Sequence, residues 1–259
     1  MRVAALYDIH ANLPALDAAL ADVRDARVDR IVIGGDVIPG PMPRDTLARL
    51  LALDIPVQFI HGNGELATLA QIGATDANAV TYWGTTSGAP PPEPIREVMR
   101  WTAHQVHPDY DRVLRSWPAT LRIEIDGLGS VLFCHGTPRS ETEGFTRLTP
   151  EDRLLPIFEG LNASVVVCGH THMQFDRMIG NVRVVNAGSV GMPFGLPRAD
   201  WLLLGPDVEL RHTAYDLARA AERVRETPYP QAHDFAATSI LQPPSEAAML
   251  ELFTNLSFR

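Results

Sequence analysis

The sequence predicts an α/β fold around a mostly parallel sheet, because short apolar strand patterns alternate with helical patterns at its start. Strand patterns return after residue 120, and polar residues stand where several of these strands end. Ligands gather at the carboxyl ends of strands in such sheets, so we expect the functional site there. A chain of 259 residues suits one large domain or two small ones, and we expect a single domain over residues 1–259.

The first sixty residues are predicted to alternate between strand and helix. The expected strands are 3–6, 31–33 and 57–60, and the expected helices are 13–23 and 45–53. Leucines recur at helical spacing in the first helix, and Pro14 suits its first turn. Glycines follow the second and third strands and end them.

Residues 66–117 break this alternation. They contain three of the four tryptophans and a proline cluster at 90–94, without a strand pattern. We expect helices and a loop here, forming a helical insertion or cap over the site. A helical packing unit without a role in function is the alternative.

Strand patterns dominate the second half. The expected strands are 121–125, 130–134, 164–168, 182–185, 201–204 and 208–212. A turn at Gly127-Leu128-Gly129 predicts a hairpin between the first two. A helix is expected from Leu217, and a final apolar stretch covers 247–253.

Composition excludes several classes of protein. The formal charge of −9 and the pI near 5.4 argue against a protein that coats nucleic acid, although bound metal could still attract a nucleotide substrate. Two cysteines exclude a disulfide scaffold. No apolar run reaches the length of a membrane span, and the start lacks a signal-peptide pattern. We therefore expect a cytoplasmic location and no membrane partner.

Residues with oxygen or imidazole donors follow the predicted strands. They occur in Asp8-Ile9-His10, Gly35-Asp36, Gly62-Asn63, Cys134-His135-Gly136 and Gly169-His170-Thr171-His172. Such donors suit divalent metals such as manganese, iron and zinc. Seven donors are too many for one ion, whereas two ions that share a carboxylate need about this number. Each motif alone is ordinary turn chemistry, but the ordered set predicts a site for two metal ions.

This ordered set resembles the calcineurin-like metallophosphoesterase superfamily. The segments Asp8-Ile9-His10-Ala11-Asn12 and Asn186-Ala187-Gly188-Ser189-Val190-Gly191 are similar to its small bacterial, phosphodiesterase-like branch. The resemblance implies a four-layer αββα sandwich, in which two mixed β-sheets are flanked by helices. It also places a dimetal site at one edge of the sheets.

The resemblance implies the ligands as well. One ion would be held by Asp8, His10, Asp36 and His172, and the other by Asp36, Asn63, His135 and His170. Asp36 would bridge the two ions, and Asp36, Asn63 and His135 would form the catalytic core. We expect manganese, with iron, zinc and nickel as alternatives.

The activity implied is the hydrolysis of phosphodiester or nucleotide-like phosphate ester bonds in a small substrate, by a hydroxide that two metals activate. A phosphomonoesterase or protein phosphatase is the alternative enzyme, and a scaffold protein of the same fold is the alternative without catalysis. The oligomeric state is left open, with a dimer among the alternatives.

One departure from the family concerns the leaving group. Many members have a histidine after the Gly-Asn pair, but this chain has Gly64, so a general acid that typically contributes 10²–10⁴-fold is missing. Tyr7 and Ala11 replace smaller residues and are expected to tighten the pocket mouth. Further candidate substrate contacts are Asn12, His61 and Arg139, the last because a guanidinium suits phosphate oxygens.

Overall fold

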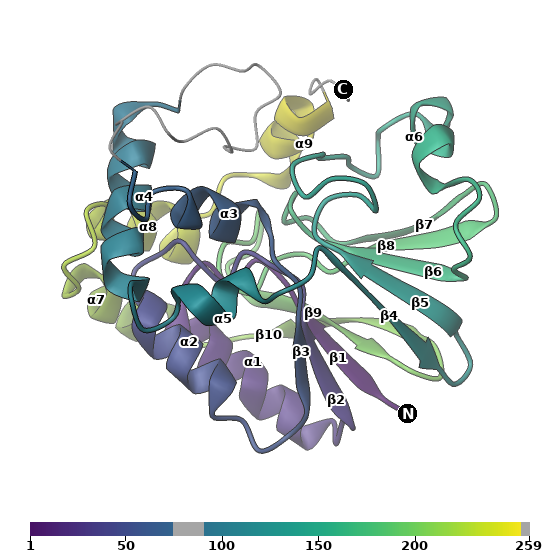
Figure 1. Ribbon diagram of the computed structural model, residues 1–259, viewed down its shortest axis with the longest axis horizontal. Helices are drawn as coiled ribbons and strands as arrows, with labels where there is room; N and C mark the ends of the chain where they lie inside the picture. Colours follow the sequence, from purple (N-terminus) through teal and green to yellow (C-terminus); the bar gives the residue numbers. More distant parts are fainter. Residues whose placement is uncertain (75–90, 255–259) are drawn as a thin grey trace.

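The computed structural model describes residues 1–74 and 91–254, which form two five-stranded sheets lying face to face with helices around them (Figure 1). The predicted α/β fold with two mixed sheets is confirmed. Among the described residues, no helix has the length and apolarity needed to cross a membrane.

The first sheet mixes parallel and antiparallel strands. Its strands are β1 (Val3–Leu6), β2 (Arg30–Ile33), β3 (Val57–Phe59), β9 (Ala199–Leu204) and β10 (Val208–Thr213). Their order is β10-β9-β1-β2-β3. β1, β2 and β3 run parallel, while β9 and β10 add an antiparallel edge.

The second sheet repeats this plan. It contains β4 (Thr120–Ile125), β5 (Gly129–Cys134), β6 (Val165–Cys168), β7 (Phe175–Ile179) and β8 (Val182–Asn186). Their order is β4-β5-β6-β8-β7, with β5, β6 and β8 parallel and antiparallel strands at both edges. β4 and β5 form the predicted hairpin.

Alternation along each strand divides the interior into layers. In β1, Ala4 and Leu6 pack into a core with the helices, whereas Val3 and Ala5 pack into a second core between the two sheets. The outer face of the first sheet is covered by α1 (Leu13–Asp25), α2 (Pro43–Leu51) and α7 (Leu217–Arg225) (Figure 1). α6 (Glu151–Phe158) covers the outer face of the second sheet. The result is helix, sheet, sheet and helix.

The segment after β3 is helical where it is described. It contains α3 (Asn63–Leu69), α4 (Glu93–Val106) and α5 (Asp111–Arg115), while 75–90, including Trp83, lie outside the described residues. α3 begins earlier than expected, because Gly62 is its N-cap and the Glu65 side chain accepts the Gly62 N–H.

Several elements escaped the sequence reasoning, among them α6 and β7. α6 is short and has Pro156 inside it, which hides the helical pattern. β7 is the short sequence Phe-Asp-Arg-Met-Ile, in which two charged residues interrupt the apolar run.

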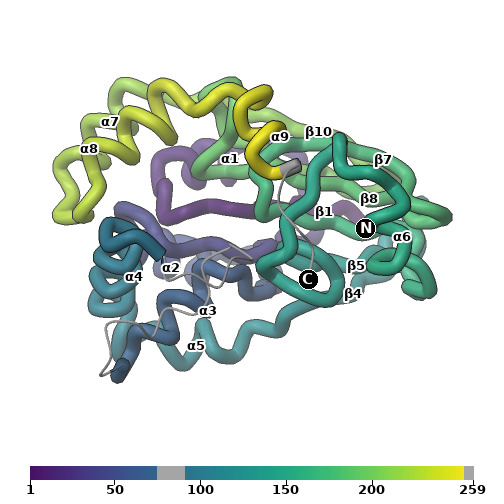
Figure 2. Tube along the Cα trace, turned by 90° about the horizontal axis from the view of Figure 1, so that it is seen from above, coloured from purple at the N-terminus to yellow at the C-terminus, as the bar shows by residue number. Residues whose placement is uncertain are grey.

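The C-terminal segment folds back over the end of the molecule where α4 lies. It contains α8 (Ala232–Phe235), the π-helical turns Ala236–Leu241, and α9 (Glu246–Thr254), which occupies the expected apolar stretch. α8 and α4 lie at the same end of the fold (Figures 1 and 2). The Gln231 Nε2 amide joins the two regions by donating to the Pro94 carbonyl at 2.9 Å.

Candidate metal centre

The expected ligands converge at the edge where parallel strands of both sheets end. Asp8 follows β1 and Asp36 follows β2, and these strands are parallel neighbours. His135 follows β5, while His170 and His172 follow β6, its parallel neighbour in the facing sheet. Because both pairs end on the same side, residues more than 100 positions apart meet at one point.

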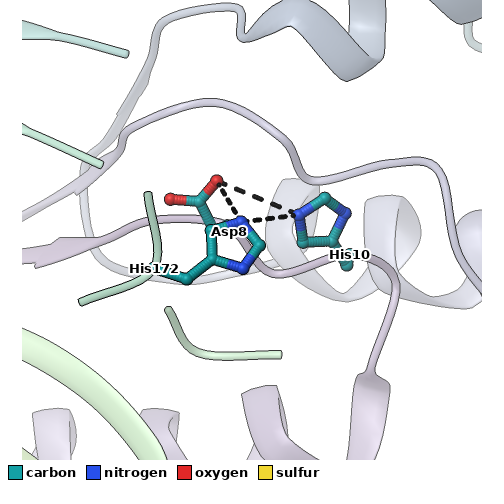
Figure 3. A group of neighbouring side chains, drawn as sticks. All are labelled: Asp8, His10 and His172. Atoms are coloured by element: carbon teal, nitrogen blue, oxygen red, sulfur yellow. Dashed lines mark hydrogen bonds and ion pairs between the residues drawn. The ribbon is translucent and has the colours of Figure 1, made fainter. Parts of the chain in front are cut away.

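A first group contains Asp8, His10 and His172, which point toward one another (Figure 3). The His172 Nε2 lies 3.1 Å from Asp8 Oδ1 and 3.2 Å from His10 Nε2. The His10 Nε2 is 3.9 Å from the same Asp8 oxygen. All three residues are buried, so one carboxylate and two imidazoles share a small space.

A second group shares Asp8 with the first and adds Asp36 and His135. The His135 Nε2 lies 3.5 Å from Asp36 Oδ1 and 3.8 Å from Asp8 Oδ1. The Asn63 Oδ1 joins this group at 3.1 Å from His135 Nε2. The other oxygen of Asp36 is 3.8 Å from His10 Nε2, so each carboxylate faces both groups.

Two observations indicate that these residues fit divalent metal ions. The first is the Asp8 Oδ1 atom, which is buried and has no hydrogen-bond partner within the described ranges. A buried carboxylate oxygen without a partner is costly unless a cation neutralises it. The second is the orientation of the imidazoles.

Three imidazoles expose Nε2 to the groups. Their Nδ1 atoms face backbone carbonyls, His10 that of Pro39 (3.3 Å), His135 that of Gly34 (2.9 Å) and His172 that of Met192 (2.8 Å). A carbonyl only accepts, so Nδ1 carries the proton and Nε2 keeps its lone pair when the ring is neutral. Metal-ligating histidines are fixed in this way.

His170 flanks the two groups. Its ring stands edge-on to that of His135, with the centroids 5.2 Å apart. His170 belongs to neither group, and it lines a pocket that lies beside them.

The charges in the centre depend on one another. Burial alone would raise the pKa of Asp8 and Asp36, but the neighbouring imidazoles, His172 first for Asp8 and His135 for Asp36, hold both pKa values below the ordinary value. In return, although burial opposes it, the carboxylates raise the pKa of His135 to about 10. Positive charge therefore stabilises the two carboxylates, and a divalent cation would serve in the same way.

The backbone at the ligands is strained. Five expected ligands have positive φ, namely Asp8 (52°), His10 (47°), Asp36 (48°), His170 (65°) and His172 (57°). Such conformations are unfavourable outside glycine and persist where the surroundings impose them. Within residues 1–74 and 91–254, only Ala11 and Arg27 join them among residues other than glycine.

Glu65 is a supporting residue that the sequence reasoning missed. Its buried carboxylate accepts the backbone N–H groups of Gly62 (2.7 Å), Asp36 (2.9 Å) and Ile38 (3.1 Å), which ties the Asp36 loop to α3. Burial and then the Asp36 charge raise the pKa of Glu65 to about 7. A glutamate three positions after a helix N-cap was the signal that could have revealed it.

Gly64 is explained by close packing. A Cβ atom there would lie 2.2 Å from the Ile38 carbonyl oxygen and 2.9 Å from Asp36 Oδ1. The Gly64 N–H donates to that same Asp36 oxygen at 2.6 Å. The position therefore has no room for a histidine side chain.

The late Asn-Ala-Gly-Ser-Val-Gly segment supports the ligand loops. Ser189 Oγ donates to the Asp8 carbonyl at 2.7 Å, and Asn186 Nδ2 donates to the Gly169 carbonyl at 2.7 Å. Asn12 Nδ2 donates to the Gly191 carbonyl at 2.9 Å. Asn12 is completely buried and does not line the pocket, so the structure gives it a supporting position.

The other candidate contacts also lie off the pocket wall. Arg139 pairs with Glu143 at 2.6 Å, and half-buried His61 is not a lining residue. Tyr7 and Ala11 are fully buried, so neither tightens the pocket mouth. Tyr7 instead packs between the sheets, where its hydroxyl donates to the Val167 carbonyl at 3.1 Å.

A pocket of about 460 Å³ opens beside the metal centre. Its polar end is formed by His10, Asp36, Asn63, His170 and His172. Its remaining wall comes from Pro39, Gly64 and Met192, from α4 and from the C-terminal segment 229–253.

Comparisons with known proteins agree with this architecture. A hypothetical protein from Pyrococcus horikoshii has a TM-score of 0.76 at 20% identity, covering 94% of this chain and 99% of its own. A metallophosphoesterase from Sphaerobacter thermophilus has a TM-score of 0.66 at 26% identity, covering 92% and 98%.

A curated relative, an uncharacterized protein of Methanocaldococcus jannaschii, is 24% identical over 249 residues, 88% of this chain and 94% of its own. The model of the calcineurin-like phosphoesterase superfamily domain matches residues 1–205, which include every expected metal ligand. The chain therefore belongs to the calcineurin-like phosphoesterase superfamily.

Proposed function

We propose that the protein is a metal-dependent phosphodiesterase that holds two divalent ions, with manganese as the first candidate. The observation that carries this proposal is Asp8 Oδ1, a buried carboxylate oxygen that makes no hydrogen bond among the described residues and faces imidazoles of both groups. It lies 3.1 Å from His172 Nε2 in one group and 3.8 Å from His135 Nε2 in the other. A shared carboxylate between two sets of donors favours a pair of ions over a single one.

Divalent ions bound there would supply a water of lowered pKa and positive charge for the phosphoryl oxygens. The protein itself holds the candidate ligands in position. The Gly64 N–H fixes one oxygen of Asp36, and Ser189 fixes the backbone of Asp8. Backbone carbonyls fix the three imidazoles, so little reorganisation is needed when a substrate binds.

We expect a diester with an acidic leaving alcohol. Because Gly64 stands where many relatives have a histidine, the leaving oxygen lacks that source of a proton, and acidic alcohols should leave best. Aryl phosphodiesters should therefore react faster than alkyl ones. A phosphomonoesterase is the competing activity.

The test combines metal analysis with two substrates. We expect two manganese ions per chain in the loaded protein, and faster hydrolysis of bis(4-nitrophenyl) phosphate than of 4-nitrophenyl phosphate. Asp8→Asn should abolish both metal binding and activity, whereas the same change at exposed Asp45 should alter neither. One ion per chain, or a preference for the monoester, contradicts the proposal.

We also infer that α4 acts as a wall of the site, which supports a cap function for 66–117. Ile95, Val98 and Met99 of this helix line the pocket. Ile95→Ala should change the preference among substrates and leave the metal content unchanged. A variant that loses its metal would instead support the packing-unit interpretation.

A further inference from the structure

The pocket beside the metal centre has an apolar wall that the family domain only partly supplies. From α4 come Ile95, Val98 and Met99, and from the C-terminal segment come Tyr229, Phe235 and Leu252. The C-terminal residues lie beyond residue 205, where the match to the family model ends. The metal ligands and a large part of the pocket wall thus come from different stretches of the chain.

We propose that this pocket selects phosphate esters whose organic group is apolar and carries no further negative charge, and that residues 229–253 set this selectivity. The inference rests on the proposed function, because the phosphoryl group has to lie at the metal centre for its organic group to enter the pocket. A volume of about 460 Å³ lies within the range of small-molecule sites.

The charge of the wall is the first argument. Among the pocket-lining residues in the described parts of the chain there is no arginine or lysine, the side chains that usually hold a phosphate or carboxylate. The wall instead contains Asp234, an exposed residue whose carboxylate has no hydrogen-bond or ion-pair partner among those residues. A second anionic group on the substrate would meet this carboxylate without compensation.

The apolar character of the wall is the second argument. Met99 is 1% exposed and Phe235 is 6% exposed, so these side chains belong to packed structure and keep a fixed shape. An alkyl or aryl group that displaces water from such a surface gains free energy in proportion to the apolar area it covers.

The third argument is the attachment of the C-terminal wall to the metal centre. The Phe194 ring stacks on the ring of His172 at a centroid distance of 5.2 Å, and Phe253 of α9 lies 6.2 Å from Phe194. The Gly195 N–H donates to the Pro244 carbonyl at 2.9 Å, just before α9. The wall is therefore held against a metal ligand.

The π-helical turns 236–241 also support a functional role for the C-terminal wall. Thr238 and Ser239 lie within these turns and line the pocket. A π-helical turn is rare and occurs frequently at functional sites. Here it brings two hydroxyl-bearing residues to the C-terminal wall of the pocket.

Phosphonates test the inference, because each carries a single organic group and is not hydrolysed. We would measure by calorimetry the binding of methylphosphonate, phenylphosphonate and 4-carboxyphenylphosphonate to the manganese-loaded protein. Phenylphosphonate should bind at least about tenfold more tightly than methylphosphonate. The added carboxylate should weaken binding at least about tenfold relative to phenylphosphonate.

Two variants with matched controls assign the selectivity to the C-terminal wall. Leu252→Ala should reduce the advantage of phenylphosphonate about threefold or more. Leu148→Ala should leave this advantage unchanged, because Leu148 does not line the pocket. The two leucines are similarly exposed, Leu252 at 57% and Leu148 at 58%. Asp234→Arg should bring 4-carboxyphenylphosphonate to within about threefold of phenylphosphonate. Glu222→Arg, on the exposed face of α7, should not.

The outcomes separate this inference from the proposed function. Equal affinities for methylphosphonate and phenylphosphonate, in a protein that hydrolyses bis(4-nitrophenyl) phosphate, overturn the inference and leave the phosphodiesterase proposal standing. Tighter binding of 4-carboxyphenylphosphonate than of phenylphosphonate overturns it too. If no phosphonate binds and the diester is not hydrolysed, the proposed function fails and this inference fails with it.

Discussion

Removing the Asn12 side chain should destabilise the protein more than the loss of an ordinary helix cap. Asn12 Oδ1 accepts the Ala15 N–H at 3.3 Å and caps α1, while its Nδ2 donates to the Gly191 carbonyl at 2.9 Å. The residue is 0% exposed, so water does not readily replace either contact. Asn12→Ala therefore breaks two buried hydrogen bonds at once.

The magnitude follows from the two contacts. Loss of an N-cap costs about 1 kcal/mol. An unsatisfied buried carbonyl at Gly191 costs roughly 1–3 kcal/mol more. We expect Asn12→Ala to lower the free energy of unfolding by about 2–4 kcal/mol. Metal binding should weaken as well, because the Gly191 N–H donates to the Asp8 carbonyl at 3.0 Å.

Urea unfolding with an unchanged m-value measures the loss. Asn12→Ser keeps a cap acceptor and loses only the bond to Gly191, so it should be less destabilised than Asn12→Ala. Asp216→Ala removes a cap of the same kind at the exposed start of α7 and should cost only about 1 kcal/mol. A loss below about 0.5 kcal/mol for Asn12→Ala would refute the reasoning, because surface substitutions have effects of that size.

Three further predictions concern the metal centre. Asp36→Asn should lose metal as Asp8→Asn does, since its oxygens lie 3.5 Å from His135 Nε2 and 3.8 Å from His10 Nε2; full metal content by elemental analysis would contradict this. Gly64→Ala should weaken metal binding, because its Cβ would lie 2.2 Å from the Ile38 carbonyl oxygen; an unchanged affinity in calorimetry would show that the loop yields at no cost. Metal affinity should fall as the pH is lowered, since the carboxylates raise the pKa of His135 to about 10 and the metal must displace that proton. Titration in two buffers of different ionisation enthalpy should detect proton release, and its absence would contradict the prediction.

The fold was predictable from the sequence wherever the periodicity was strong. The apolar runs of β1, β5 and β6 and the helical spacing of α1 all coincide with the observed elements. The boundary of α2 shifted to Pro43–Leu51, because Pro43 suits a first helical turn better than the expected start at Asp45. Elements with mixed composition gave no such signal; in β7, Asp176 and Arg177 interrupt the apolar run, although its partner strand β8 is the next one along the chain.

The candidate metal ligands could be predicted from the sequence better than the residues that hold them in place. Donors after strand ends are a local pattern, so Asp8, Asp36 and His135 could be selected without coordinates. The capping pattern could mark Glu65 as a helix cap, but its second contact, with the backbone of Asp36 29 positions away, is not a local pattern. Arg139 had the right chemistry for a phosphate, but Glu143 four positions later neutralises it.

The backbone of the ligand loops shows why the sequence could suggest the site and still miss its strain. Asp36 has a φ of 48°, beside Gly35 at 92°. Glycine at Asp36 would relax the backbone, but it would also remove the carboxylate that faces both groups of donors. A side chain kept at such positions, where each costs about 1–3 kcal/mol, is retained for what its atoms bind. The same reasoning applies to Asp8, which combines a φ of 52° with a buried oxygen that makes no hydrogen bond among the described residues, so backbone strain and an unmade hydrogen bond point independently to one centre.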